Sequence, residues 1–309
     1  MIVLEDLPDE LLLCIFDYVD TDQLFNAFWG LNERLNRLFQ SCQIRSLNYN
    51  EETDLSSVLI YSEYVNRMII DTSKQINLNQ FPNVHMLVLA NKYRTHFDMI
   101  DSNHFSRLTH LTLLLGANFT LPIRLLNEIF SNKFPSLIYA DLGKINYHED
   151  NLFIDCPSLK HLAIRINQIE ILTSILNICP NLNHLQLHIL NIKVCKSDSS
   201  QLKHSLHRLT LWTEKISLDC ESIQSILCYA IKVQHLYLQT ECEISLIDLC
   251  KCVVHQLPYL YRFRGHIKYL NKDQQNRIRD VSLLHEIHPC FDRMKSIEDK
   301  EDFCIFATD

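Results

Sequence analysis

The sequence predicts an α/β protein in which a small N-terminal unit of three helices precedes an irregular solenoid of short parallel strands and helices. Two patterns lead to this fold class: helical spacing of apolar residues in the first forty positions, and an apolar motif that recurs ten times after residue 44. The expected boundaries are 1–43 for the helical unit, 44–268 for the repeats and 269–309 for a C-terminal cap.

The N-terminal helices follow from the apolar spacing. A first helix carries Leu11, Leu12, Ile15, Phe16 and Val19 on one stripe, with Asp6 and Pro8 where a cap and an early proline belong. A second helix is expected from Thr21 to Phe28, either Gly30 or Leu31-Asn32 breaks it, and a third follows over 31–39. Three helices in about 40 residues bury little among themselves. The unit is therefore expected to keep an apolar face for a partner.

The repeat has the form apolar, two residues, apolar, one residue, apolar. Because alternate residues of a strand point to the same side, the last two apolar positions mark the buried face of a short strand. The ten copies are Ile44/Leu47/Tyr49, Val65/Met68/Ile70, Val84/Leu87/Leu89, Leu108/Leu111/Leu113, Leu137/Ala140/Leu142, Leu159/Leu162/Ile164, Leu182/Leu185/Leu187, Leu206/Leu209/Leu211, Val233/Leu236/Leu238 and Leu260/Phe263/Gly265.

Helical stretches separate the later strands, over 121–133, 169–178, 221–230 and 244–256. A strand, a turn and a helix every twenty-odd residues is the leucine-rich repeat pattern, whose units stack with strands on a concave face and helices on a convex face. After the repeats, a polar helix is expected over 273–279, and Leu283, Leu284, Ile287 and Phe291 are expected to close the end of the stack. A solvated turn over 298–302 and a short strand over 303–306 are expected to follow.

Composition and charge exclude several function classes. With 4 glycines in 309 residues, no window matches a dinucleotide fingerprint or a P-loop, and we expect no cofactor. The net charge is −8, of which residues 1–40 contribute −6 (eight acids, two arginines), leaving −2 for the rest. This balance argues against nucleic-acid or anionic-membrane partners. The longest uncharged stretch, 108–123, is too short and too polar to cross a bilayer.

The N-terminus turns acidic at once and lacks the basic start of a secretory signal. The twelve cysteines are irregularly spaced, so we expect free thiols in a reducing compartment, the cytoplasm and/or the nucleus. No Cys-x-x-Cys, His-Glu-x-x-His or Gly-x-Ser-x-Gly sequence occurs, and Cys250 and Cys252 have the wrong spacing for a zinc site. We expect neither a metal site nor catalytic residues.

The run from Leu7 to Val19, followed by Asp22-Gln23-Leu24, resembles the F-box motif over about residues 3–42. The third helix departs from the family, which often has Cys-Arg and Trp where this chain has 31–35. The resemblance implies docking on a Skp-family adaptor and, through it, on a cullin ubiquitin ligase. The residues that would contact the adaptor are Leu7, Pro8, Glu10, Leu11, Ile15, Phe16, Val19 and Leu24.

Residues 44–268 resemble the leucine-rich repeats of F-box proteins, through Cys156-Pro157-Ser158-Leu159 and Cys179-Pro180-Asn181-Leu182. The asparagine or cysteine expected after the last apolar position is present only as Asn167, so we expect a short, irregular solenoid. The concave wall is predicted to consist of His161, Ala163, Arg165; His184, Gln186, His188; Arg208, Thr210, Trp212; His235, Tyr237, Gln239; Arg262, Arg264 and His266. Arginine and aromatic residues are enriched at binding hot spots. The predicted target-binding residues are Arg165, His184, His188, Trp212, Tyr237 and Arg264.

The expected function is that of a non-catalytic subunit that recognises an unknown protein substrate for a Skp–cullin–F-box ubiquitin ligase. Two alternatives remain open at this level. The chain could be a ligase-independent scaffold, built from the same repeats but without the adaptor. It could also be an enzyme whose Cys–His pair forms only in space, although no local sequence signals one.

Overall fold

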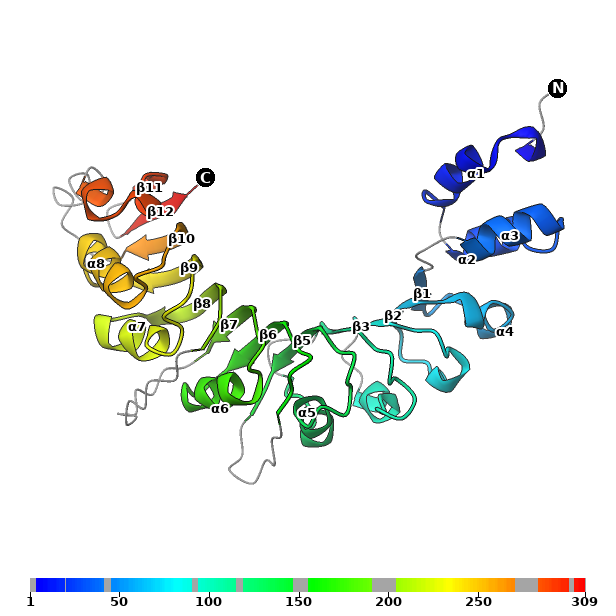
Figure 1. Cartoon of the computed structure of the whole chain (residues 1–309), viewed down its shortest axis with the longest axis horizontal. Coiled ribbons are helices and arrows are strands. Elements are labelled where there is room, and N and C mark those ends of the chain that lie inside the picture. Colours follow the sequence, from blue (N-terminus) through cyan, green and yellow to red (C-terminus); the bar gives the residue numbers. More distant parts are fainter. Residues whose placement is uncertain are drawn as a thin grey trace. The chain divides into compact units, whose positions relative to one another are not determined.

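The computed structural model describes residues 4–19, 21–41, 46–90, 94–114, 119–146, 155–190, 204–269, 283–299 and 303–308. The chain has an α/β fold whose strands are mostly parallel (Figure 1). It divides into two compact units: unit 1 holds residues 1–116 and 133–137, and unit 2 holds residues 117–132 and 138–309. This division does not coincide with the expected boundaries at 43/44 and 268/269.

Unit 1 begins with the three predicted helices. These are α1 (Asp9–Phe16), α2 (Thr21–Phe28) and α3 (Glu33–Ser41), preceded by the short 3-10 helix η1 (Leu4–Asp6). The expected break falls at Gly30, whose φ of 82° is a left-handed conformation that glycine adopts without steric cost. The expected cap at Asp6 is wrong: Pro8 occupies the N-cap of α1, and no side chain caps it.

Four strands follow in unit 1: β1 (Ser46–Asn50), β2 (Arg67–Asp71), β3 (Met86–Leu89) and β4 (His110–Leu113). They pair in parallel, each with the next along the chain. The connections contain only short helices: α4 (Leu55–Leu59), η2 (Ser62–Tyr64), η3 (Leu78–Gln80) and η4 (Arg94–Met99). The sequence pattern indicated none of these four.

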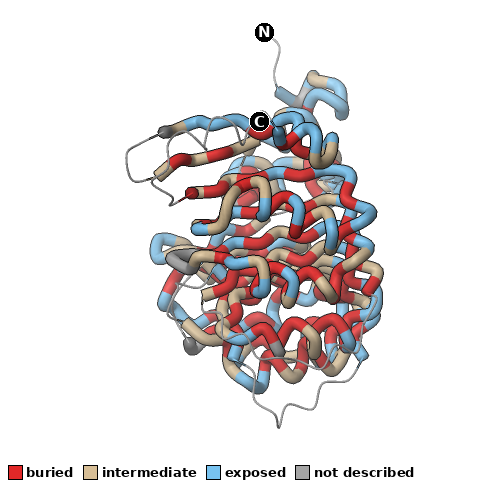
Figure 2. The backbone as a smooth tube through the Cα atoms, turned by 90° about the vertical axis from the view of Figure 1, so that its left-hand side faces the viewer, coloured by how far each residue is buried: buried red, intermediate tan, exposed pale blue. Residues whose placement is uncertain are grey.

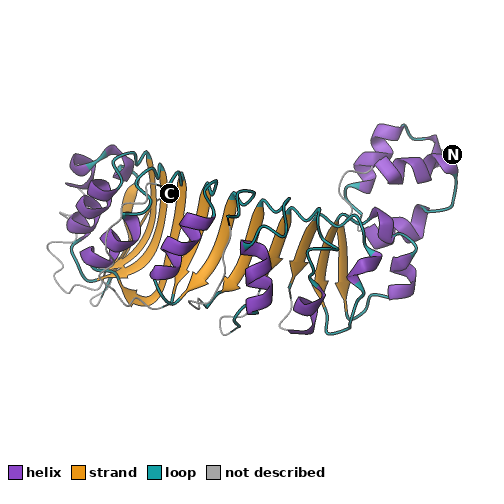
Figure 3. Ribbon diagram, turned by 60° about the horizontal axis from the view of Figure 1, so that its bottom comes forward, coloured by secondary structure: helices purple, strands orange, loops and turns teal. Residues whose placement is uncertain are grey.

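Unit 2 continues the same alternation with longer elements. Its parallel strands are β5 (Tyr139–Lys144), β6 (His161–Ile166), β7 (His184–Ile189), β8 (Arg208–Ser217), β9 (His235–Cys242) and β10 (Arg262–Tyr269). The helices before and between these strands are α5 (Ile123–Phe130), α6 (Glu170–Ile178), α7 (Cys220–Leu227) and α8 (Leu246–Gln256), all four near their predicted positions. A helical segment over 283–287 and the 3-10 helix η5 (Pro289–Phe291) follow β10. Within this unit the helices cover one face of the sheet (Figure 3).

The core lies between the strands and the helices, where Figure 2 shows the buried residues concentrated. All ten predicted strands are present, and the two inward apolar positions of each are buried. Leu111, Leu162 and Leu185, for example, are at most 1 % exposed. The pattern of apolar residues therefore located every strand of β1–β10, because an inward side chain that was polar would lose its hydration without compensation.

The C-terminal segment completes unit 2. Strand β12 (Cys304–Thr308) pairs antiparallel with β10, and β11 (Met294–Asp299) pairs antiparallel with β12. The short predicted strand is thus confirmed, whereas the predicted solvated turn is wrong in its first two residues, which belong to β11. Of the residues expected to close the stack, Leu284 and Phe291 are buried and Leu283 is exposed. The predicted helix over 273–279 lies outside the described residues.

Candidate functional site

The N-terminal helices present a partly apolar surface in unit 1. Leu11 is 50 % exposed, and the side chains of the turn after α1 are exposed as well, with Tyr18 at 92 %. Among the other predicted adaptor-contact residues, Pro8 and Glu10 are exposed, while Leu7, Ile15 and Val19 are half-buried. Phe16 and Leu24 are 3 % and 4 % exposed, so in this structure the chain itself covers them.

Aromatic side chains account for much of the packing that buries one side of the N-terminal helices. Phe16 packs on Phe28 with ring centroids 5.3 Å apart. Phe25 packs on Tyr61, which follows α4, with a centroid distance of 4.3 Å. Aromatic pairs of this kind contribute about 0.5–1.5 kcal/mol beyond their buried area. The helices therefore pack on the first repeat of unit 1 through their aromatic side and leave the Leu11 side uncovered.

Arg34 of α3 ties the third helix to the start of the first. Its guanidinium donates to the Asp9 carboxylate, with an Nε–Oδ1 distance of 2.8 Å, and to the carbonyl oxygen of Leu7 at 2.6 Å. A guanidinium can hold both acceptors because its donors lie in one plane. Arg34 thus fixes the orientation of the segment from Leu7 to Asp9.

The second surface is the outer face of the unit 2 strands, at the positions between the buried apolar residues. The strand register aligns these positions in three columns. They are His161, His184, Arg208, His235 and Arg262; Ala163, Gln186, Thr210, Tyr237 and Arg264; and Arg165, His188, Trp212, Gln239 and His266. The predicted alignment of these fifteen residues, here called the strand face, is confirmed.

Aromatic contacts run across the strand face from strand to strand. The ring centroids of His161 and His184 lie 5.9 Å apart, and those of Trp212 and Tyr237 lie 6.5 Å apart. Trp212 is 43 % exposed and also contacts the ring of His188. His188 itself is 8 % exposed, and its ring packs beside that of the exposed Trp212.

Arginine charges act on the histidines of the strand face. Burial and then the Arg208 guanidinium lower the pKa of His161. Burial, His161 and Arg208 lower the pKa of His184, and burial, Arg208 and Arg262 lower that of His235. Arg208 therefore disfavours a further positive charge on three strands at once. His184 is also oriented by Thr210, whose Oγ1 lies 3.4 Å from His184 Nε2.

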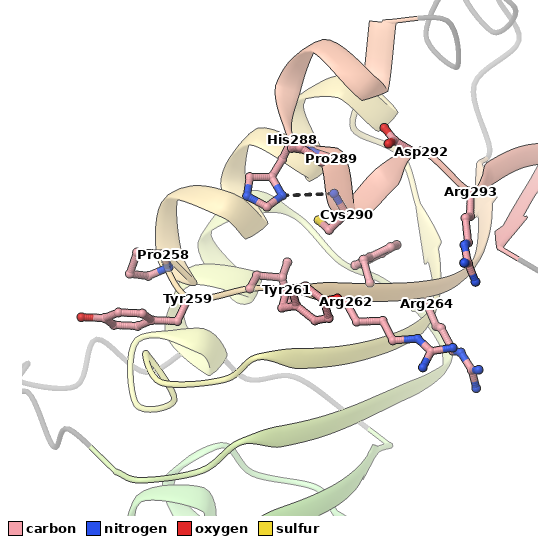
Figure 4. A pocket seen from close by; sticks show the side chains of 12 residues that line it. Pro258, Tyr259, Tyr261, Arg262, Arg264, His288, Pro289, Cys290, Asp292 and Arg293 are labelled. Atoms are coloured by element: carbon pink, nitrogen blue, oxygen red, sulfur yellow. Dashed lines mark hydrogen bonds between the residues drawn. The ribbon is translucent and has the colours of Figure 1, made fainter.

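Two hollows lie beside the arginines of β8 and β10, besides a smaller one of about 80 Å³ that is lined by Arg165, Trp212 and Asp141 of β5. A hollow of about 190 Å³ is lined by Arg208, Arg262 and Arg264 together with His184, His235 and Tyr237. A wider hollow of about 710 Å³ lies between the start of β10 and the segment 288–293. In Figure 4 the side chains of Arg262 and Arg264 run in the same direction and end next to each other, with Arg293 on the same side.

Sequence reasoning did not single out the residues that complete the wider hollow. Tyr261 is 79 % exposed, and its ring contacts His235 at 6.3 Å. Arg293 reaches the hollow from a segment that lies outside the repeats. Tyr261 directly precedes Arg262, the first residue of the predicted wall on this strand. Its position in the sequence could therefore have indicated that it belongs to the same surface. Arg293 carried no signal, because only the fold brings residues 288–293 back to β10.

Within the described ranges, no group of three or more His, Cys, Asp or Glu residues is arranged to hold a metal ion. Cys156 and Cys179, which share a repeat position, are buried and contact each other, and this contact raises the pKa of Cys179. Packing therefore accounts for this pair. No helix in the described ranges is long and apolar enough to cross a membrane.

Comparison with known proteins identifies no family for the chain. A scan against models of protein families finds no match, and a search of the curated proteins finds no relative.

Proposed function

We propose that the chain is the target-recognition subunit of a Skp–cullin–F-box ubiquitin ligase, with the adaptor on the N-terminal helices and a protein target on the strand face. The observation that carries the proposal is the exposure of Leu11 together with Tyr18, within a motif that resembles the F-box, on helices that pack on Tyr61 through Phe25. Exposed apolar surface made by several residues is typical of a docking surface, whereas a single exposed residue is not.

The proposed architecture is a leucine-rich-repeat solenoid with the strand face on its concave side. Two features support it: the parallel pairing of successive strands, and the helices that cover the opposite side of the sheet in unit 2. In this arrangement the chain catalyses nothing. It raises the local concentration of the target near the conjugating enzyme, because adaptor and target occupy separate surfaces of one chain.

The residues divide into contacts and supports under this proposal. Leu7, Pro8, Glu10, Leu11, Ile15 and Val19 are assigned to the adaptor surface. Phe16 and Leu24 are assigned to the packing that holds α1 and α2 in place. On the strand face, Trp212 is the exposed aromatic anchor. Tyr237 contacts it from the neighbouring strand β9, and Arg165 and Arg264 lie two strands away, on β6 and β10.

The test is a binding measurement between the full chain and a purified Skp-family adaptor. Leu11→Asp places a charge on the uncovered apolar surface and is expected to weaken adaptor binding at least tenfold, about 1.4 kcal/mol or more. Ile60→Asp is the matched control, because Ile60 is 67 % exposed in the same unit but lies outside the three helices. The control is expected to bind like wild type.

Absence of adaptor binding by wild type, or equal binding by the Leu11→Asp and Ile60→Asp variants, would contradict the ligase assignment. The first of these results favours the ligase-independent scaffold. Circular dichroism of both variants shows whether a loss of binding reflects a loss of folding.

A further inference from the structure

The strand face of unit 2 carries an unbalanced positive charge. Its fifteen residues include four arginines and no aspartate or glutamate. Arg165 lies close enough to Asp141 of β5 to oppose the rise that burial causes in the pKa of that carboxyl. Arg208, Arg262 and Arg264 form no ion pair with any described residue. Within the described part of the chain, these three guanidinium groups therefore have no carboxylate partner.

The three arginines converge although they come from two strands. All three line the hollow of about 190 Å³ between β8 and β10, and no carboxylate lines it with them. The lowered pKa of His235, caused by burial and then by Arg208 and Arg262, is a second sign of their combined field. Like charges held together in this way repel one another. An anionic ligand that binds between them is attracted to all three and relieves their repulsion, and both effects favour binding.

The spread of the charges favours an extended ligand over a single compact anion. Strands lie about 4.8 Å apart, so the arginines of β6, β8 and β10 span about 19 Å. In an extended peptide, alternate side chains recur about every 6.6 Å on one side. The arginines of β6, β8 and β10 are about 9.6 Å apart from strand to strand, so their long side chains must lean toward one another to meet a row of carboxylates at alternate positions. The rings of Trp212, Tyr237 and Tyr261 lie among these arginines and offer contact area to the residues between the carboxylates.

A nucleic acid fits these observations less well. Its affinity comes from many phosphate contacts along the backbone, whereas the strand face offers four arginines in a chain of net charge −8. A short acidic segment of a protein needs only a few such contacts. Arginine also pairs with a carboxylate through two parallel hydrogen bonds, which gives the pairing a preferred geometry.

We propose that the strand face binds an extended acidic segment of a protein, with carboxylates that pair with Arg208, Arg262 and Arg264. The inference rests on the proposed function only in calling that protein the ligase target. It names the class of substrate segment: several aspartates or glutamates at alternate positions, with apolar or aromatic residues between them.

The test measures fluorescence anisotropy with the full chain and a labelled peptide of about eight residues in which Glu and Val alternate. A matched peptide with Gln in place of Glu removes the charge and keeps the length. The Glu peptide is expected to bind at least tenfold more tightly than the Gln peptide, and to lose affinity as the salt concentration rises.

The protein variant replaces Arg208, Arg262 and Arg264 by Gln and is expected to weaken binding of the Glu peptide at least tenfold. The matched control replaces Arg107, Lys133 and Lys251 by Gln. It removes the same charge from three exposed residues that lie outside both hollows. The control is expected to bind the peptide as wild type does.

The proposal is overturned if wild type does not bind the Glu peptide at about 1 mM, or if the two triple variants bind it equally. Tighter binding of a single-stranded oligouridylate than of the peptide also overturns it. The adaptor measurement separates this inference from the proposed function. Peptide binding without adaptor binding contradicts only the ligase assignment. Adaptor binding without peptide binding contradicts only the proposal that the strand face binds an acidic segment.

Discussion

The strands of unit 1 and the strands of unit 2 share one backbone pattern but present different surfaces. In both units the two inward positions of the repeat motif are buried in every strand. Unit 2 also buries Thr213 and Thr240 further along β8 and β9, where the Thr213 hydroxyl donates to that of Thr240. The outward positions of β1–β4 include one arginine, one aspartate and no tryptophan or tyrosine; they are Ser46, Asn48, Asn50, Arg67, Ile69, Asp71, Met86, Val88, His110 and Thr112. The strand face of unit 2 instead gathers arginine, histidine, tyrosine and tryptophan. The apolar positions therefore specify the repeat, and the positions between them specify what each unit can bind.

The connections differ between the units as well. Unit 1 joins its strands through α4 and three 3-10 helices of three to six residues. In unit 2, α5 precedes β5, and α6, α7 and α8 join β6 to β7, β8 to β9 and β9 to β10; these α-helices have eight to eleven residues. Helices of three to six residues cannot form a continuous apolar stripe over two helical turns, so periodicity alone did not predict those of unit 1. The same strand motif thus occurs with a short α-helix and 3-10 helices in unit 1 and with longer α-helices in unit 2.

The largest expected effect tests whether the buried positions are equivalent in the two units. Leu111→Ala in unit 1 and Leu185→Ala in unit 2 each remove a fully buried side chain, and each is expected to cost about 2–5 kcal/mol of unfolding free energy. Urea denaturation of both variants measures the cost. A difference larger than about 2 kcal/mol between the two would show that the repeats are not equivalent.

A second prediction compares one glycine from each unit. A Cβ at Gly265 would lie 2.7 Å from the ring of Phe263, which is itself packed 4.9 Å from Phe291. Gly265→Ala is therefore expected to cost about 1–3 kcal/mol through overpacking. Gly30→Ala meets open space but has a φ of 82°, and is expected to cost about 1–2 kcal/mol through backbone strain.

Asparagine distinguishes the two causes, because it tolerates the left-handed region better than alanine does. Gly30→Asn should recover part of the loss seen in Gly30→Ala, whereas Gly265→Asn should be worse than Gly265→Ala. Thermal denaturation of the four variants reports the order. Recovery by asparagine at both positions would disprove the overpacking at Gly265.

A third prediction concerns the pH dependence of unit 2. Burial, opposed by the hydrogen bond from the ring of His204 to the carbonyl oxygen of Cys179, lowers the pKa of His204. Since the folded-state pKa lies below that of the unfolded chain, near 6.5, the unfolded state takes up the proton first as the pH falls. Stability is complete above about pH 6.5 and decreases below it.

His204→Gln removes the titrating group and leaves an amide that can donate to the same carbonyl oxygen. Unfolding free energies at pH 7.5 and pH 5.5 are expected to differ less in this variant than in wild type. An unchanged difference would mean that His204 does not contribute to the pH dependence.

The smallest expected effect is on the ion pair of the N-terminal helices. Arg34 Nη2 lies 2.6 Å from Asp9 Oδ1, but the two side chains are 37 % and 53 % exposed. Water and salt screen such a pair, so Asp9→Asn is expected to cost less than about 1 kcal/mol, and less still at high salt. Urea denaturation at two salt concentrations measures it; a larger cost would mean that Arg34 holds the start of α1 more firmly than the exposed pair suggests.

Much of the fold could be predicted because burial leaves a periodic trace in the sequence. The ten apolar motifs located β1–β10. Separate apolar stripes, one containing Leu12 and another containing Leu125, located helices in both units. Local sequence could not predict β11, because Met294–Asp299 becomes a strand only by pairing with β12. The same limit applied to Phe16 and Leu24, whose apolar character indicated burial but not whether a partner or the chain itself buries them.

The sequence by itself determined the strands and their faces, since a residue's place in a strand follows from the alternation of inward and outward side chains. The repeat also predicted which outward residues align from strand to strand, but only the tertiary structure decided which of them gather around one hollow. Arg208 and Arg264 are 56 positions apart in the chain, yet both line one hollow because β8 and β10 both pair with β9. Charge interactions depend on distance in space, and the strand register is what converts this long sequence separation into one surface.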